Sequence, residues 1–150
     1  DEHNLRIVKG GGRVWQSGRI RSRYTPRARL GALWRQYLQY GYWKPFVMKK
    51  HGQPASLRHL IPGLFVLALL AGLLLLPFGS WPLAALLLAY GGVLALATTS
   101  LVGQGAAVLL RAPAVVAAYH LGYGLGSVLG WIDVLRGAEA GRGRFAELTR

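Results

Sequence analysis

A chain of 150 residues is long enough for one ordinary domain, but 53% of these residues are hydrophobic and the formal net charge is +13. The absence of cysteine excludes a disulfide framework and a thiolate metal site. The charge is uneven, because residues 1–60 hold 13 of the 18 lysines and arginines, whereas residues 61–150 hold five. A basic segment ahead of a long apolar region is typical of a membrane protein whose first part lies in the cytoplasm.

Three apolar runs follow the basic segment, over residues 60–78, 83–105 and 113–135. Each has about the 20 residues that a helix needs to cross a bilayer. Pro77 and residues 79–82, Gly-Ser-Trp-Pro, predict a tight turn with its tryptophan at the membrane surface. We therefore expect about three spans, with Pro113 able to open the third helix.

The third run contains small and polar residues that a simple span does not need. Gly122, Gly124, Gly126 and Gly130 would let helices approach closely. His120 is a functional candidate as an ionisable group inside a membrane, although a hydrogen-bonded packing role is the commoner one. Three spans place the basic tail, residues 136–150, outside the cell, against its charge; a re-entrant or interfacial last segment is the alternative.

Before the first run, the pattern predicts one short helix and two short strands. Asp1 to Lys9 carries acidic residues first and basic residues last, which suits a helix dipole, and three glycines follow it. Residues 13–16 and 19–24 are the strand candidates, because arginine alternates with other side chains in the second of them. Ser17-Gly18 between them predicts a turn.

Residues 28–50 predict an amphipathic helix lying at the membrane surface. Leu30, Trp34 and Leu38 recur at helical spacing, and basic residues supply the polar side. In the same helix, the indole of Trp43 could stack on a sugar ring while the amide of Gln39 reaches its hydroxyl groups. An aromatic belt at the membrane surface would produce the same pattern.

Two further groups of side chains could carry chemistry. Asp1 and Glu2 could act as a general base or as metal ligands, although acids at a helix start more often complement the dipole. Arg19, Arg21 and Arg23 lie on one face of the second predicted strand and could hold a diphosphate or an anionic lipid headgroup. A solvated basic face would look the same.

The chain resembles the C-terminal part of membrane-bound family 2 glycosyltransferases of the succinoglycan type, which build bacterial exopolysaccharide. The resemblance rests on four stretches, in the order DEHNLRI, RYTPRARLGALWRQYLQYGYWK, KKHGQPASLRHLIP and AYHLGYGLGSVLG. It implies inverting transfer from a nucleotide-diphospho-sugar to a lipid-linked or saccharide acceptor. It also implies a GT-A fold upstream that holds a divalent metal, Mg or Mn, through an Asp-x-Asp not found in this chain.

The resemblance also implies roles for particular residues. Asp1 and Glu2 fall on the family's acidic motif, which contains the catalytic base; the resemblance implies either Asp1 or the residue that precedes it in the longer protein. The family's Gln-x-x-Arg-Trp motif falls on Gln39, Tyr42 and Trp43, with Tyr42 in place of the arginine. These three are therefore the expected acceptor-binding residues.

Together these observations predict a mixed fold. Residues 1–59 would be the C-terminal remnant of a GT-A α/β domain, with short strands and the interfacial helix, and residues 60–135 an all-α transmembrane region. The expected location is the bacterial inner membrane, with residues 1–59 in the cytoplasm. Without its upstream part, the chain is expected to be inactive. The alternative is a membrane-anchored subunit that binds anionic lipid or assists assembly without catalysis; no nucleic acid is expected as a partner.

Overall fold

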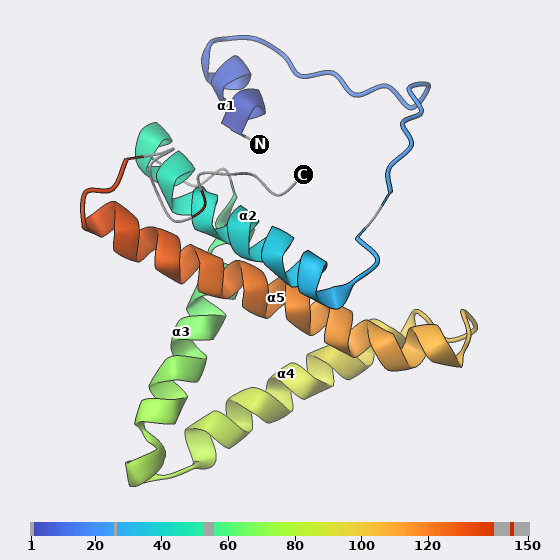
Figure 1. The fold of residues 1–150 in the computed structure, drawn as a ribbon, viewed down its shortest axis with the longest axis vertical. Coiled ribbons are helices and arrows are strands. Elements are labelled where there is room, and N and C mark those ends of the chain that lie inside the picture. The colour runs from blue at the N-terminus through green and yellow to red at the C-terminus, as the bar shows by residue number, and fades with distance from the viewer. Residues whose placement is uncertain (1, 26, 53–55, 140–144, 146–150) are drawn as a thin grey trace.

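The computed structural model describes residues 2–25, 27–52, 56–139 and 145, and these residues form helices and no strand (Figure 1). In chain order the elements are α1 (Glu2–Lys9), α2 (Leu30–His51), the 3₁₀ turn η1 (Leu57–His59), α3 (Ile61–Leu74), the 3₁₀ turn η2 (Leu76–Phe78), α4 (Trp81–Thr99) and α5 (Ala106–Leu135). Helices α2 and α5 lie side by side, and α3 and α4 extend away from them as a hairpin (Figure 1).

The predicted mixed fold is wrong, because neither strand candidate is a strand. Residues 13–16 and 19–24 belong to an exposed connection that runs from α1 to the start of α2 (Figure 1). The predicted turn between them is present, since the N–H of Ile20 donates to the carbonyl oxygen of Ser17 at 3.2 Å. A strand needs a neighbour to pair its backbone groups, and the described residues supply none. The alternation of arginine therefore marks a solvated segment rather than a remnant of a GT-A sheet.

The two N-terminal helices end at glycines in the left-handed conformation. Gly11 follows α1 with φ +80°, and Gly52 follows α2 with φ +70°. After α1, the N–H of Gly12 donates to the carbonyl oxygen of Ile7 at 2.9 Å. Glycine is favoured at such positions because it lacks the Cβ that strains this conformation.

Glycine at every fourth position of α5 lets α2 lie directly against it. A Cβ added to any of the three would meet a carbonyl oxygen of α2, and the facing pairs are Gly122 with Trp34, Gly126 with Leu38 and Gly130 with Tyr42. The differences 122 − 34, 126 − 38 and 130 − 42 are all 88, so the two helices run parallel. Such close approach of backbones is what small residues permit between membrane helices.

A buried hydrogen bond joins the C-terminal halves of α2 and α5. The hydroxyl of Tyr42 donates to Oδ2 of Asp133 at 2.8 Å. The Tyr42 side chain is fully buried, and Asp133 is 8% exposed. Tyr42 also packs with Phe46 and Val134 in a small apolar core. Because breaking a buried hydrogen bond costs about 1–3 kcal/mol, this bond helps to fix how far α2 and α5 are shifted along one another.

Three segments are long and apolar enough to cross a membrane: Leu57–Leu74, α4 and α5. α4 buries none of its residues, which suits a helix surrounded by lipid, because lipid tails are as apolar as leucine. The chain reverses between α3 and α4 at η2 and Gly79, where a turn was predicted. Gly79 can leave the helical conformation because it has no Cβ, and Pro82 suits the first turn of α4, where its missing N–H needs no partner.

α5 is longer than the predicted third run. It begins at Ala106, after Gly105 with φ +100°, and Pro113 lies inside it rather than at its start. A proline inside a helix removes one backbone hydrogen bond. Seven additional residues therefore extend α5 ahead of the residue expected to open it.

Candidate functional site

A cavity of about 480 Å³ lies where α2, η1 and α5 meet near the start of α1. We call it the Trp43 pocket, and its lining residues are Glu2, Tyr40, Trp43, Lys44, Val47, His59 and Tyr123. The four from α2, Tyr40, Trp43, Lys44 and Val47, stand at positions i, i+3, i+4 and i+7, so they share one face of that helix. His59 comes from the turn before α3, and Tyr123 comes from α5. The packing of α2 against α5 thus brings together residues that are far apart in the sequence.

Three lining residues carry a buried polar atom that has no hydrogen-bond partner in the described part of the chain. These atoms are Nε1 of Trp43, Nδ1 of His59 and the hydroxyl oxygen of Tyr123. Buried polar groups in proteins are nearly always hydrogen-bonded, and leaving one unpaired costs about 1–3 kcal/mol. Their gathering around one cavity indicates a place where a polar ligand or water completes the hydrogen bonds.

The pocket also has a positive side. Burial, and then the positive charge of Arg58, lower the pKa of Lys44 from its ordinary value. Arg58 precedes His59 in η1, so the two cationic side chains lie near the point where the first apolar segment begins. An anion placed here would offset the repulsion between Lys44 and Arg58. Phosphate is an anion of this kind, since both ammonium and guanidinium groups bind it.

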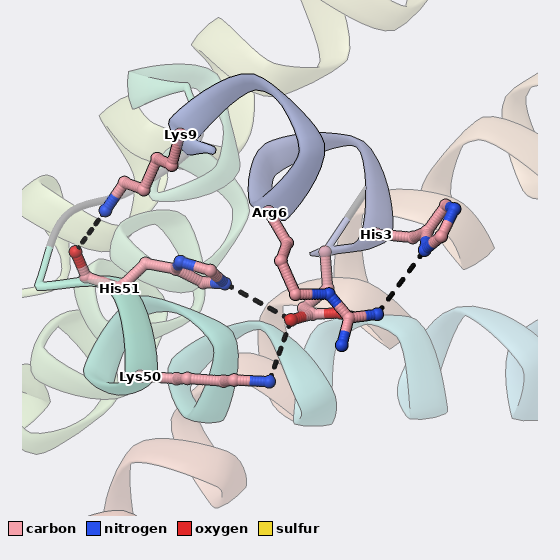
Figure 2. Close-up of polar contacts among 6 residues, drawn as sticks. His3, Arg6, Lys9, Lys50 and His51 are labelled. Atoms are coloured by element: carbon pink, nitrogen blue, oxygen red, sulfur yellow. Dashed lines mark hydrogen bonds and ion pairs between the residues drawn. The ribbon is translucent and has the colours of Figure 1, made fainter. Parts of the chain in front are cut away.

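The carboxylate of Glu2 is tied to the end of α2 (Figure 2). Lys50 donates from Nζ to Oε1 of Glu2 at 2.9 Å, and Nε2 of His51 lies 3.3 Å from the same oxygen. Arg6 approaches the other oxygen at 3.8 Å. A second link runs from Nζ of Lys9 to the carbonyl oxygen of His51 at 2.7 Å (Figure 2). Together these bonds hold α1 against α2.

This arrangement decides how basic Glu2 can be. The hydrogen bond from Lys50, against the effect of burial and with help from His51 and Arg6, lowers the pKa of Glu2 to about 2. A general base works best when its pKa is near the working pH, so a carboxylate with this pKa is a weak base at neutral pH. In this structure Glu2 is an ionic anchor for α1. Asp1, the other predicted catalytic acid, lies outside the described residues.

We expect the docking of α1 on α2 to be constant above about pH 4.5 and to weaken as the pH falls toward 2. The pKa of Glu2 is lowered by docking, so its contribution is fully present above the ordinary value of 4.5 and is lost as the pH falls through about 2. The measurement is the distance between spin labels on Val8→Cys and Leu57→Cys; the chain has no cysteine of its own.

The matched control is Glu2→Gln, which keeps the shape of the side chain and should remove this pH dependence. Salt should also loosen the docking in the parent chain, because Glu2 is partly exposed and surface ion pairs are screened. A label distance that stays the same down to pH 2 would show that Glu2 does not hold α1.

The three predicted acceptor-binding residues have different surroundings. Trp43 lines the pocket, whereas Gln39 and Tyr42 are buried within α2's packed face. The rings of Tyr42 and Trp43 meet edge to face, with centroids 5.3 Å apart. The hydrogen bond from Tyr42 to Asp133 fixes the position of the Tyr42 ring. This ring in turn packs against the indole of Trp43.

The predicted phosphate or headgroup residues lie elsewhere. Arg19, Arg21 and Arg23 are exposed on the connection between α1 and α2, and they do not line the Trp43 pocket. The structure therefore does not bring them together with the other predicted site residues.

Sequence reasoning missed five residues of the pocket: Tyr40, Lys44, Val47, His59 and Tyr123. No local motif marks them, because their neighbourhood exists only once α2 has packed on α5. The one signal in the sequence was the spacing of Gly122 and Gly126, which predicted that another helix would approach the segment containing Tyr123.

The resemblance also implies a divalent metal, whose protein ligands would be carboxylate or imidazole groups. Within residues 2–25, 27–52, 56–139 and 145, no three His, Asp or Glu side chains come together as a ligand set. The described part of the chain therefore does not fit such a metal.

Comparison with known proteins gives one informative similarity. The chain is 32% identical over 114 residues to the succinoglycan biosynthesis protein ExoA of Rhizobium meliloti (strain 1021), which covers 71% of this chain and 34% of the relative. The chain thus spans about a third of that relative's length. No family model matches the chain, and no solved structure matches it. By sequence, the chain is therefore similar to part of a succinoglycan biosynthesis protein.

Proposed function

We propose that this chain is the membrane part of a glycosyltransferase of exopolysaccharide synthesis, and that the Trp43 pocket holds the acceptor. The observation that carries this proposal is the set of three unpaired polar atoms around one cavity that is also lined by aromatic rings. The similarity to a protein named for succinoglycan biosynthesis supports the exopolysaccharide role. Three helices able to cross a membrane support a membrane location.

The chemistry of the pocket suits a sugar. The ring faces of Trp43 and Tyr40 can stack on the C–H face of a pyranose. The indole N–H of Trp43, the hydroxyl of Tyr123 and the ring nitrogen of His59 supply donors and an acceptor for sugar hydroxyl groups. A volume of about 480 Å³ is within the range of pockets that bind small ligands.

The position of the pocket favours a lipid-linked sugar as the acceptor. Lys44 and Arg58 lie close to the start of the Leu57–Leu74 segment, at the level where a membrane lipid would carry its phosphate. A phosphate bound there would leave the attached sugar beside Trp43. A free saccharide would use the same stacking and hydroxyl contacts but would not use the positive side.

In the proposed reaction, an acceptor hydroxyl attacks the anomeric carbon of a nucleotide-diphospho-sugar with inversion, and the nucleotide diphosphate leaves. The acceptor hydroxyl gives its proton to a base, for which Asp1 remains the sequence-based candidate. Glu2 keeps α1 beside the pocket through its bonds to Lys50 and His51. We assign the donor site and any metal to no residue of this chain.

The test is transfer of labelled sugar by the complete protein in membranes. Each of a panel of nucleotide sugars is supplied with lipid extract or oligosaccharide as acceptor, and label is followed into lipid-extractable or saccharide product. Transfer from one of these donors is the expected result. Failure of all donors with all acceptors would overturn the proposal and favour a lipid-binding or assembly role without catalysis.

A further inference from the structure

A second cavity lies inside the membrane region, separate from the Trp43 pocket. It has a volume of about 340 Å³ and is lined by residues of η1, α3, α4 and α5. We call it the interhelix cavity, and its lining residues are Arg58, Ile61, Pro62, Phe65, Tyr90, Val93 and His120. Because the helices that border it are able to span a membrane, lipid can reach it from the side.

The wall of this cavity is polar at two places. Arg58 is exposed at the entrance, in the turn that precedes α3. Deeper along the helices, the hydroxyl of Tyr90 and Nδ1 of His120 are 3.2 Å apart and share a hydrogen bond. Phe65 packs against Tyr90 in a tilted arrangement, with ring centroids 4.5 Å apart. The His120–Tyr90 pair confirms the hydrogen-bonded state predicted for His120.

These groups follow one another along the cavity in the same order as the charged head and the apolar chain of a lipid phosphate ester. A charged guanidinium stands at the boundary of the apolar segment, then aromatic and aliphatic side chains follow, with a hydroxyl–imidazole pair among them. Arginine binds phosphate through its planar fork of donors. The remaining lining is apolar enough for a hydrocarbon chain, while the Tyr90–His120 pair can meet an ester or phosphate oxygen.

We infer that the interhelix cavity binds a phosphate ester of a membrane lipid, with its phosphate on Arg58 and the first part of its chain between α3 and α4. The inference shares Arg58 with the lipid phosphate proposed for the Trp43 pocket and rests on the proposed function to that extent. The other residues of the cavity do not line that pocket, so variants of these other residues test the interhelix cavity alone. Both a bulk anionic phospholipid and a prenyl phosphate have this chemistry, and the experiment separates them.

The experiment measures which lipids stay bound to the purified chain after transfer from vesicles into mild detergent, by native mass spectrometry. The vesicles contain phosphatidylcholine alone, phosphatidylcholine with phosphatidylglycerol, or phosphatidylcholine with a long-chain prenyl phosphate. Preferential retention of phosphatidylglycerol would identify a bulk phospholipid, and preferential retention of the prenyl phosphate would identify a lipid carrier. Equal retention of the zwitterionic and anionic lipids would overturn the inference.

Arg58→Gln should weaken retention roughly ten- to a hundredfold, the usual effect of losing a charged hydrogen bond. Arg111→Gln is the matched control, because it removes the same charge from an exposed arginine that does not line the cavity. Equal retention by these two variants would show that the lipid is held elsewhere.

A second pair of variants tests the cavity without changing charge. Val93→Trp should fill the space and displace the lipid, whereas Leu88→Trp on the exposed side of α4 should not. Unchanged retention by a folded Val93→Trp chain would overturn the placement of the lipid between α3 and α4.

Discussion

Replacing Gly126 with leucine is expected to separate α2 from α5 and to destroy the Trp43 pocket. A Cβ at this position would overlap the carbonyl oxygen of Leu38, which is backbone and cannot rotate away. Overpacking of a close contact costs about 1–3 kcal/mol in most cases and more where backbone must move. We therefore expect Gly126→Leu to lower the stability of the detergent-solubilised chain by at least about 3 kcal/mol, with Gly126→Ala already clearly destabilising.

Gly92→Leu on α4 is the matched control for this prediction. A Cβ on Gly92 meets no atom within 4 Å, so the same change of residue type should leave stability nearly unchanged. Both variants can be compared by thermal unfolding monitored by circular dichroism. Equal stability of Gly126→Leu and Gly92→Leu would contradict the close packing of α2 on α5.

Replacing Trp43 with alanine in the complete protein is expected to lower kcat/KM for the acceptor roughly thirtyfold, and up to a hundredfold. Loss of stacking on a sugar removes about 1 kcal/mol, and loss of the indole hydrogen bond removes about another 1 kcal/mol. Together they correspond to this decrease in kcat/KM. Trp43→Phe keeps a ring but loses the N–H, so its expected loss is smaller, about three- to tenfold.

The control for this prediction is Trp15→Ala. Trp15 is 89% exposed on the connection between α1 and α2 and does not line the pocket. Its replacement should leave sugar transfer at the level of the parent protein. If Trp43→Ala had the same kcat/KM for the acceptor as Trp15→Ala, the acceptor would have to bind outside the Trp43 pocket.

The helices were the part of this fold that could be predicted, because each has a local cause. The predicted helix at residues 28–50 is α2, Leu30–His51, since its side-chain spacing and the glycine after it act within a few residues. The three segments able to cross a membrane follow from uninterrupted apolar composition. The strands at 13–16 and 19–24 failed because a strand depends on a partner, and alternation within a segment cannot show whether one is present.

The candidate site could be predicted only in part. Trp43 was identified because an indole on a helix at a membrane surface has few uses other than anchoring and stacking. Lys44 and Tyr123 were not, because their roles depend on how α2 and α5 pack. The anchor role of Glu2 depends on Lys50, which is 48 residues away, and no local pattern links the two. Glycine spacing in α5 indicated that a helix would approach, but it could not tell which one.

The pairing of α2 with α5 also sets an order of events during synthesis. The last residue of α2 leaves the ribosome 84 residues before the last residue of α5, since these are residues 51 and 135. At about 5–20 residues per second, this is a delay of about 4–17 s. During that time α5 does not yet cover the aromatic face of α2. An amphipathic helix with such a face binds at the surface of the bilayer. The Trp43 pocket is thus completed only after α5 has been synthesised and has packed against α2.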